Sequence, residues 1–172
     1  MTHQSREVMS NTKIGIIVAI FAALTLSSYV LTSSVSAQGP PTISVSLTGK
    51  EEVPPVETKA SGVAEFKQVG TEYRVYSVKA TNIQGSTAGH IHLGAKGENG
   101  PIVFTLFKYD TSKNQVLETG TITADKLEGP MAGKHLSDLA TAGVNDMLYV
   151  NIHTELNPNG EIRGQIGSPI TP

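Results

Sequence analysis

Three histidines stand at positions where strand geometry would let them share one metal ion. His90 and His92 flank Ile91, and His153 follows Ile152 in a segment with the same alternating pattern. Side chains at positions i and i+2 of a strand point to the same face, with Cα atoms about 7 Å apart. Imidazole nitrogen is a good ligand for Zn²⁺ and Cu²⁺, so the three histidines predict a metal site if their two strands are paired.

The same alternation predicts a larger polar set on the face that carries the histidines. If the isoleucines and valines of these segments are buried, the opposite face carries His90, His92, Asn151, His153, Glu161, Arg163 and Gln165. The short Asn-Pro-Asn-Gly loop at 157–160 favours pairing of the last two strands as a hairpin, which brings His153 near Glu161 or Arg163. We expect Glu161 or Asn151 to orient the histidines by hydrogen bonding.

Three interpretations of this polar face stay open. The side chains form a hydrogen-bonded network in which Glu161 pairs with Arg163, and no ligand is bound. Alternatively, His90, His92 and His153 bind Zn²⁺ or Cu²⁺, which are the cofactors that the sequence suggests. In the third interpretation the histidines, whose ordinary pKa is about 6.5, form a pH-responsive contact surface. The pattern does not decide whether the face is exposed or buried.

The composition excludes several classes of function. The chain contains no cysteine, which removes thiolate metal sites, cysteine nucleophiles and disulfides. Its formal net charge is −2, and the part after Ala37 has 11 basic and 14 acidic residues. We therefore expect neither nucleic-acid binding nor a polybasic membrane-binding surface. No complete catalytic constellation is visible, and we expect a protein that is not an enzyme.

The first 37 residues have the layout of an export signal. Arg6 and Lys13 precede an uncharged hydrophobic stretch at 14–31, and small residues at 35–37 form a context for signal-peptidase cleavage. A helix of about 18 residues is about 27 Å long, which is also close to the thickness of the hydrocarbon core of a membrane. We expect residues 1–37 to be a signal peptide or a retained N-terminal anchor, and the protein to be secreted or held at the cell surface.

The chain that follows has the pattern of short strands. Apolar and polar residues alternate at 43–48, and similar runs at 63–66, 73–78, 88–93, 102–107, 116–122, 148–153 and 161–166 are separated by glycine, proline and asparagine. Strands of this length and spacing are typical of an antiparallel sandwich or barrel. After a linker at 38–42, we predict one all-β domain at 43–168, an antiparallel β-sandwich of Greek-key type.

One helix is expected within this domain, at 135–142. Leu136 and Leu139 lie on one face of it, and Gly143 supplies its stop. We expect it to be a crossover connection that covers an open end of the sandwich.

Motifs spread over most of the chain resemble the CHRD (chordin-type) domain. They occur in order at 47–56 (LTGKEEVPPV), 60–62 (ASG), 88–92 (AGHIH), 99–101 (NGP), 149–154 (YVNIHT) and 158–165 (PNGEIRGQ). The resemblance runs from about residue 43 to residue 166 and implies a β-sandwich-like extracellular module of a kind common in microbial exported proteins. It implies binding of a protein, a polymer or a component of the cell envelope through the polar face and its loops.

The histidine pair also has a weaker likeness. His90-x-His92 on a strand is similar to the first copper-ligand pair of Cu/Zn superoxide dismutases. Those enzymes require further ligands, including an aspartate, and no matching segment follows here. Dismutase-type activity is therefore the third hypothesis, after a binding module and a metal-binding protein.

Overall fold

The computed structural model of the chain describes residues 42–69 and 73–167. The predicted export segment at 1–37 and all but the last residue of the predicted linker lie outside these residues. Within the described ranges, no helix is both long enough and apolar enough to cross a membrane.

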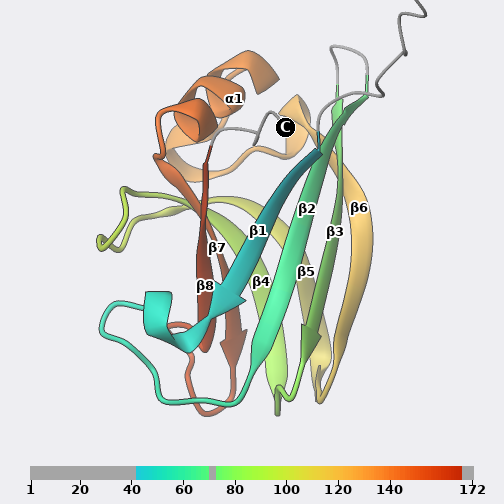
Figure 1. Cartoon of the computed structure of the whole chain (residues 1–172). Coiled ribbons are helices and arrows are strands. Elements are labelled where there is room, and N and C mark those ends of the chain that lie inside the picture. The colour runs from blue at the N-terminus through green and yellow to red at the C-terminus, as the bar shows by residue number, and fades with distance from the viewer. Residues whose placement is uncertain (1–41, 70–72, 168–172) are drawn as a thin grey trace, which may run out of the picture. The chain divides into compact units, whose positions relative to one another are not determined.

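The described residues form eight antiparallel strands and one short α-helix (Figure 1). The strands are β1 (Thr42–Thr48), β2 (Ser61–Val69), β3 (Tyr73–Thr81), β4 (Ser86–Leu93), β5 (Ile102–Lys113), β6 (Val116–Thr123), β7 (Leu148–Thr154) and β8 (Ile162–Ile166). Helix α1 (Leu136–Val144) connects β6 to β7, and single turns of 3₁₀ helix lie at Gly49–Glu51, Ala124–Lys126 and Gly129–Met131. The all-β class predicted from the alternating pattern is confirmed.

The eight strands belong to one sheet, so the predicted sandwich of two packed sheets is wrong. Their order is β5-β4-β7-β8-β1-β2-β3-β6, and the sheet curls into a barrel-like shape (Figure 1). The two end strands are consecutive in the chain and are linked by a hydrogen bond from Tyr109 to Glu118 and an ion pair between Lys113 and Glu118. Alternation produces one inner and one outer face in a sandwich and in a barrel, so it does not distinguish them.

The inner face of the sheet carries the hydrophobic core. Residues from five strands are at most 1% exposed there: Leu47, Val78, Ile91, Val150 and Ile162. Because side chains alternate along a strand, burying these residues turns their polar neighbours on β4, β7 and β8 to the outer face. The core therefore determines the orientation of the histidines.

Strand β8 lies inside the sheet, between β7 and β1. It pairs with β7 as the predicted hairpin, with Asn151 opposite Arg163. On its other side the backbones approach closely, since a Cβ atom on Gly164 would lie 2.2 Å from the Ser46 carbonyl oxygen. Glycine is required at this position because no side chain fits.

Helix α1 is the predicted crossover, and Figure 1 shows it at one end of the barrel. Its buried face includes Leu136 and Leu139, as expected. Gly143 does not stop the helix, however, because it is a buried helical residue. The helix continues for one more residue, and Asn145 forms the C-cap.

The core position of Leu47 leads to a stability prediction. Leu47 is fully buried, whereas Leu117 is 69% exposed on an outer position of β6. Leu47→Ala leaves a cavity and should lower the free energy of unfolding by about 2–5 kcal/mol. Leu117→Ala is the matched control and should change it by less than about 0.5 kcal/mol. Urea denaturation measures both, and equal losses would contradict the assignment of the inner face.

Candidate metal centre

The three predicted histidines lie together on the outer face of the sheet. His90 and His92 belong to β4, and His153 belongs to the neighbouring strand β7. The register places His153 opposite Ala88, one diagonal step from His90. The ring centroid of His153 is 4.8 Å from that of His90 and 5.7 Å from that of His92, and the two rings on β4 are 5.7 Å apart.

The ring nitrogens are close enough to share an ion after small movements. One candidate nitrogen from each histidine lies within 4.8 Å of the others, and no further histidine or carboxylate among the described residues joins the group. Metal–nitrogen bonds of about 2.0–2.1 Å in a tetrahedral site place the ligand nitrogens about 3.4 Å apart. Coordination would therefore require the rings to close by about 1.5 Å at most.

Backbone carbonyls orient two of the three rings. His92 Nδ1 lies 2.9 Å from the Gly100 carbonyl oxygen, and His153 Nδ1 lies 3.0 Å from the Pro158 carbonyl oxygen. A carbonyl oxygen only accepts, so each Nδ1 carries the proton and donates it, and each Nε2 keeps its lone pair. Histidine ligands of metal ions commonly have their second nitrogen held in this way.

Three buried ring nitrogens have no hydrogen-bond partner among the described residues. They are Nδ1 of His90, Nε2 of His92 and Nε2 of His153. Buried polar atoms normally find a partner, so a cluster of three without one requires an explanation. Binding of a cation by their lone pairs is the interaction that would satisfy all three at once.

Each of the three imidazoles is held in its neutral form. Burial lowers the pKa of His90 to about 3, with help from the neighbouring His153, His92 and Lys108. Burial also lowers the pKa of His92 and of His153, and outweighs the opposing hydrogen bonds from these rings to the carbonyls of Gly100 and Pro158. Neutral imidazole is the form that coordinates a metal, so no proton has to be displaced near neutral pH.

A stack of three side chains runs outward from the histidines across β4, β7 and β8. The Tyr149 ring lies parallel to the His92 ring with a centroid distance of 4.9 Å and an interplanar angle of 10°. The Arg163 guanidinium lies over the Tyr149 ring, with its Cζ atom 3.5 Å from the ring centroid. This cation–π contact holds the Tyr149 ring against the His92 ring.

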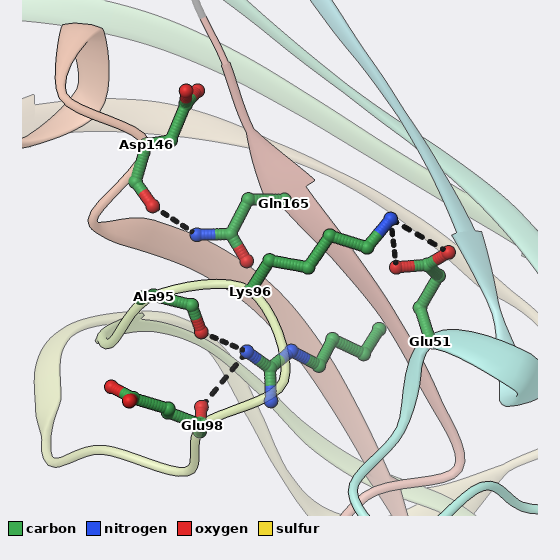
Figure 2. A network of polar contacts seen from close by, with 7 residues as sticks. Glu51, Ala95, Lys96, Glu98, Asp146 and Gln165 are labelled. Carbon is green, nitrogen blue, oxygen red and sulfur yellow. Dashed lines mark hydrogen bonds and ion pairs between the residues drawn. The ribbon is translucent and has the colours of Figure 1, made fainter.

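Arg163 also holds the 94–101 loop that joins β4 to β5. It is 1% exposed and donates to Oδ1 of Asn99 and to the carbonyl oxygens of Ala95 and Glu98, two residues that Figure 2 labels. Gln165 donates to the carbonyl oxygens of Gly94 and Asp146 from the same strand. The loop whose Gly100 carbonyl orients His92 is therefore fastened to β8.

A buried carboxylate, that of Glu52, lies close enough to Arg163 to interact with it electrostatically. Glu52 is 4% exposed and accepts a hydrogen bond from Asn151 Nδ2. Burial raises the pKa of Glu52 to about 7, although Arg163 and Asn151 act in the opposite direction. Gly160 has a φ of +139° and packs against this pair, since a Cβ atom there would lie 2.6 Å from both side chains.

Glu161 belongs to a separate cluster at the end of the barrel away from α1. It accepts hydrogen bonds from Thr58, Thr154 and Asn157. Burial raises its pKa, but these hydrogen bonds outweigh burial and leave the pKa below the ordinary value of a glutamate. The predicted pairing of Glu161 with Arg163 is wrong, because Arg163 bonds to the 94–101 loop instead.

The structure places all seven predicted residues of the polar face on or beside the outer side of β4, β7 and β8. The expected orienting role of Glu161 or Asn151 is not seen. Asn151 bonds to Glu52 and to the Asn159 carbonyl oxygen. The carbonyls of Gly100 and Pro158 orient His92 and His153 instead. Much of the face is buried, with Asn151 at 2% exposure. Sequence reasoning missed Tyr149, although it alternates with Val150, and missed Glu52, which lies in a loop without a pattern.

Comparison with known protein families identifies one domain in the chain. The family model described as the CHRD domain matches residues 43–166. No curated protein and no solved structure matches the chain.

Arg163 and Lys96 should contribute unequally to holding the 94–101 loop in place. Arg163→Lys loses the stack and most of the bonds to the loop, and should lower the free energy of unfolding by about 2–4 kcal/mol, because hydrogen bonds to buried charges are strong. Lys96→Met removes the surface ion pair with Glu51, whose partners are 72% and 37% exposed (Figure 2), and should cost less than about 1 kcal/mol. Amide hydrogen exchange at 95–100 should accelerate only in Arg163→Lys, and unchanged exchange there would contradict the fastening role.

Glu52 should give the protein a stability that depends on pH near neutrality. Its pKa is about 7 in the folded protein, against an ordinary value of 4.5, so the folded state holds the proton more tightly. Its stabilising contribution is complete below pH 4.5 and is lost as the pH rises through 7.

The test compares wild type with Glu52→Gln, which cannot ionise. Wild type should lose about 3 kcal/mol of unfolding free energy relative to Glu52→Gln between about pH 4.5 and pH 8. Urea denaturation across this range measures the difference, and Glu57→Gln, at an exposed position of the same loop, should track the wild type. A difference between wild type and Glu52→Gln that stays constant with pH would contradict the assignment.

Proposed function

This chain belongs to the CHRD domain family, and on that premise we propose that it is a non-enzymatic module that binds one divalent transition-metal ion on His90, His92 and His153. The observation that carries the proposal is the convergence, from two paired strands, of three buried ring nitrogens that have no hydrogen-bond partner in the described part of the chain. The donor set consists of neutral nitrogens alone, which suits Zn²⁺ and Cu²⁺ better than Ca²⁺ or Mg²⁺.

Several features support a preorganised site. Two rings are fixed by the carbonyls of Gly100 and Pro158, which decides which nitrogen is available to an ion. Their pKa values lie below the ordinary value of histidine, so protons compete weakly with the metal. By the order of stability of divalent ions at nitrogen sites, Cu²⁺ should bind more tightly than Zn²⁺.

The predicted protein, polymer or envelope partner remains a second part of the proposal. Asn151 and Arg163 are buried and engaged with loops, so they are poorly placed to contact a partner directly. We assign that role to the exposed loops around the centre, at 95–99 and 155–159. Three protein ligands also leave a coordination position that water or a donor from a partner can occupy.

Metal binding is tested with the purified protein and a matched set of histidine variants. We expect one equivalent of Zn²⁺ or Cu²⁺ by elemental analysis and calorimetry, and bands typical of tetrahedral coordination with Co²⁺. His90→Ala/His92→Ala should abolish stoichiometric binding. His135→Ala changes an exposed histidine at the N-cap of α1 and should leave binding within about threefold of wild type.

Two outcomes would refute the metal proposal. The first is absence of stoichiometric binding by wild type. The second is equal binding by wild type and the double variant, which would place the ion elsewhere.

A further inference from the structure

A partly open cavity of about 170 Å³ lies between the sheet and helix α1. Its walls come from the sheet and from the buried face of the helix, and they include Phe66, Ile91, Ile122, Leu136, Leu139 and Leu148. The cavity is open to solvent on one side, because its lining also includes Gln68, which is exposed, and Val144, which is 53% exposed. An apolar space of these dimensions is suited to a small apolar molecule rather than to ordered water.

Two polar side chains line the same cavity and give it a polar side. Gln68 on β2 and Arg74 on β3 face each other directly in the register. Each is two residues from a buried inward-facing aromatic residue, Phe66 and Tyr76 respectively, so both lie on the inner side of their strands. They are at the open rim of the cavity, because Gln68 is exposed and Arg74 is half-buried. The two side chains form the polar rim of an otherwise apolar cavity.

The cavity therefore combines an apolar body with a guanidinium. An arginine has five N–H donors in a planar fork that matches a carboxylate. Arg74 can therefore bind a carboxylate in addition to the partners it already has. We propose that this cavity binds a small amphipathic carboxylate, with its hydrocarbon part among Phe66, Ile122 and Leu139 and its carboxylate on Arg74.

The volume sets the size of the ligand. An apolar cavity of about 150 Å³ accommodates benzene, which has six carbons. The apolar lining thus suits a hydrocarbon part of about six to eight carbons, and the rest of a longer chain would extend through the open side. Each methylene that is added within this limit should raise affinity about fourfold, the equivalent of about 0.8 kcal/mol.

This site is independent of the proposed metal centre. Ile91 lies between His90 and His92 in β4, but its side chain points into the barrel and lines the cavity, whereas the histidines lie on the outer face. Ligand binding is accordingly tested on metal-free protein, and the result stands whether or not a metal is bound at the histidines.

The experiment titrates hexanoate, octanoate and 1-octanol into the purified protein by calorimetry. We expect saturable binding of one octanoate per chain and weaker binding of hexanoate. Arg74→Gln should lower octanoate affinity about tenfold or more, because a charge-assisted contact is lost, while 1-octanol affinity changes by less than about threefold. Retained binding of 1-octanol shows that the variant is folded.

Ala140→Leu, which adds volume at a residue lining the cavity, should weaken both ligands, and His90→Ala/His92→Ala should weaken neither. Absence of saturable binding by octanoate and 1-octanol would overturn the proposal. Octanoate binding that is insensitive to both Arg74→Gln and Ala140→Leu would overturn it as well, since the ligand would then lie elsewhere.

Discussion

The outer face of this protein depends on the burial of Arg163. A guanidinium does not lose its proton inside a protein, so a side chain that is 1% exposed must find acceptors. Among the described residues no carboxylate lies within ion-pair distance of it; the acceptors come from the 94–101 loop, and the Tyr149 ring covers its face. Because the same loop supplies the Gly100 carbonyl to His92, the orientation of a candidate metal ligand on β4 depends on an arginine on β8.

Strand β4 shows how one short segment serves two environments. His90 and His92 face outward toward His153, and Ile91 between them faces the cavity under α1. Gly89 is part of the same arrangement, since a Cβ atom there would lie 2.4 Å from the Phe107 ring. A change of one residue in the register of β4 would exchange the two faces and remove both sites together.

The alternating pattern was sufficient to predict the strands, their inner residues and the convergence of His90, His92 and His153. It could not distinguish a sandwich from a barrel-like sheet, because both bury one face of every strand. It also could not reveal Glu52 or the carbonyls of Gly100 and Pro158, since loops have no period and every residue has a carbonyl. Gly100 is no exception: a Cβ atom there would lie 1.7 Å from the Leu93 carbonyl oxygen, and this close approach is visible only in the folded chain.

The interior position of β8 has a consequence for the order in which the domain can assemble. Its residues 162–166 complete the sheet between β7 and β1. Until they are in place, β7 and β1 expose unpaired backbone edges, which are prone to association with other chains. Contacts between β1 and β8 also join the most distant parts of the described sequence, and such nonlocal pairing slows folding. During synthesis from the N-terminus, β1 to β7 therefore emerge before the strand that completes the sheet. The nascent domain should depend on chaperones until β8 is available.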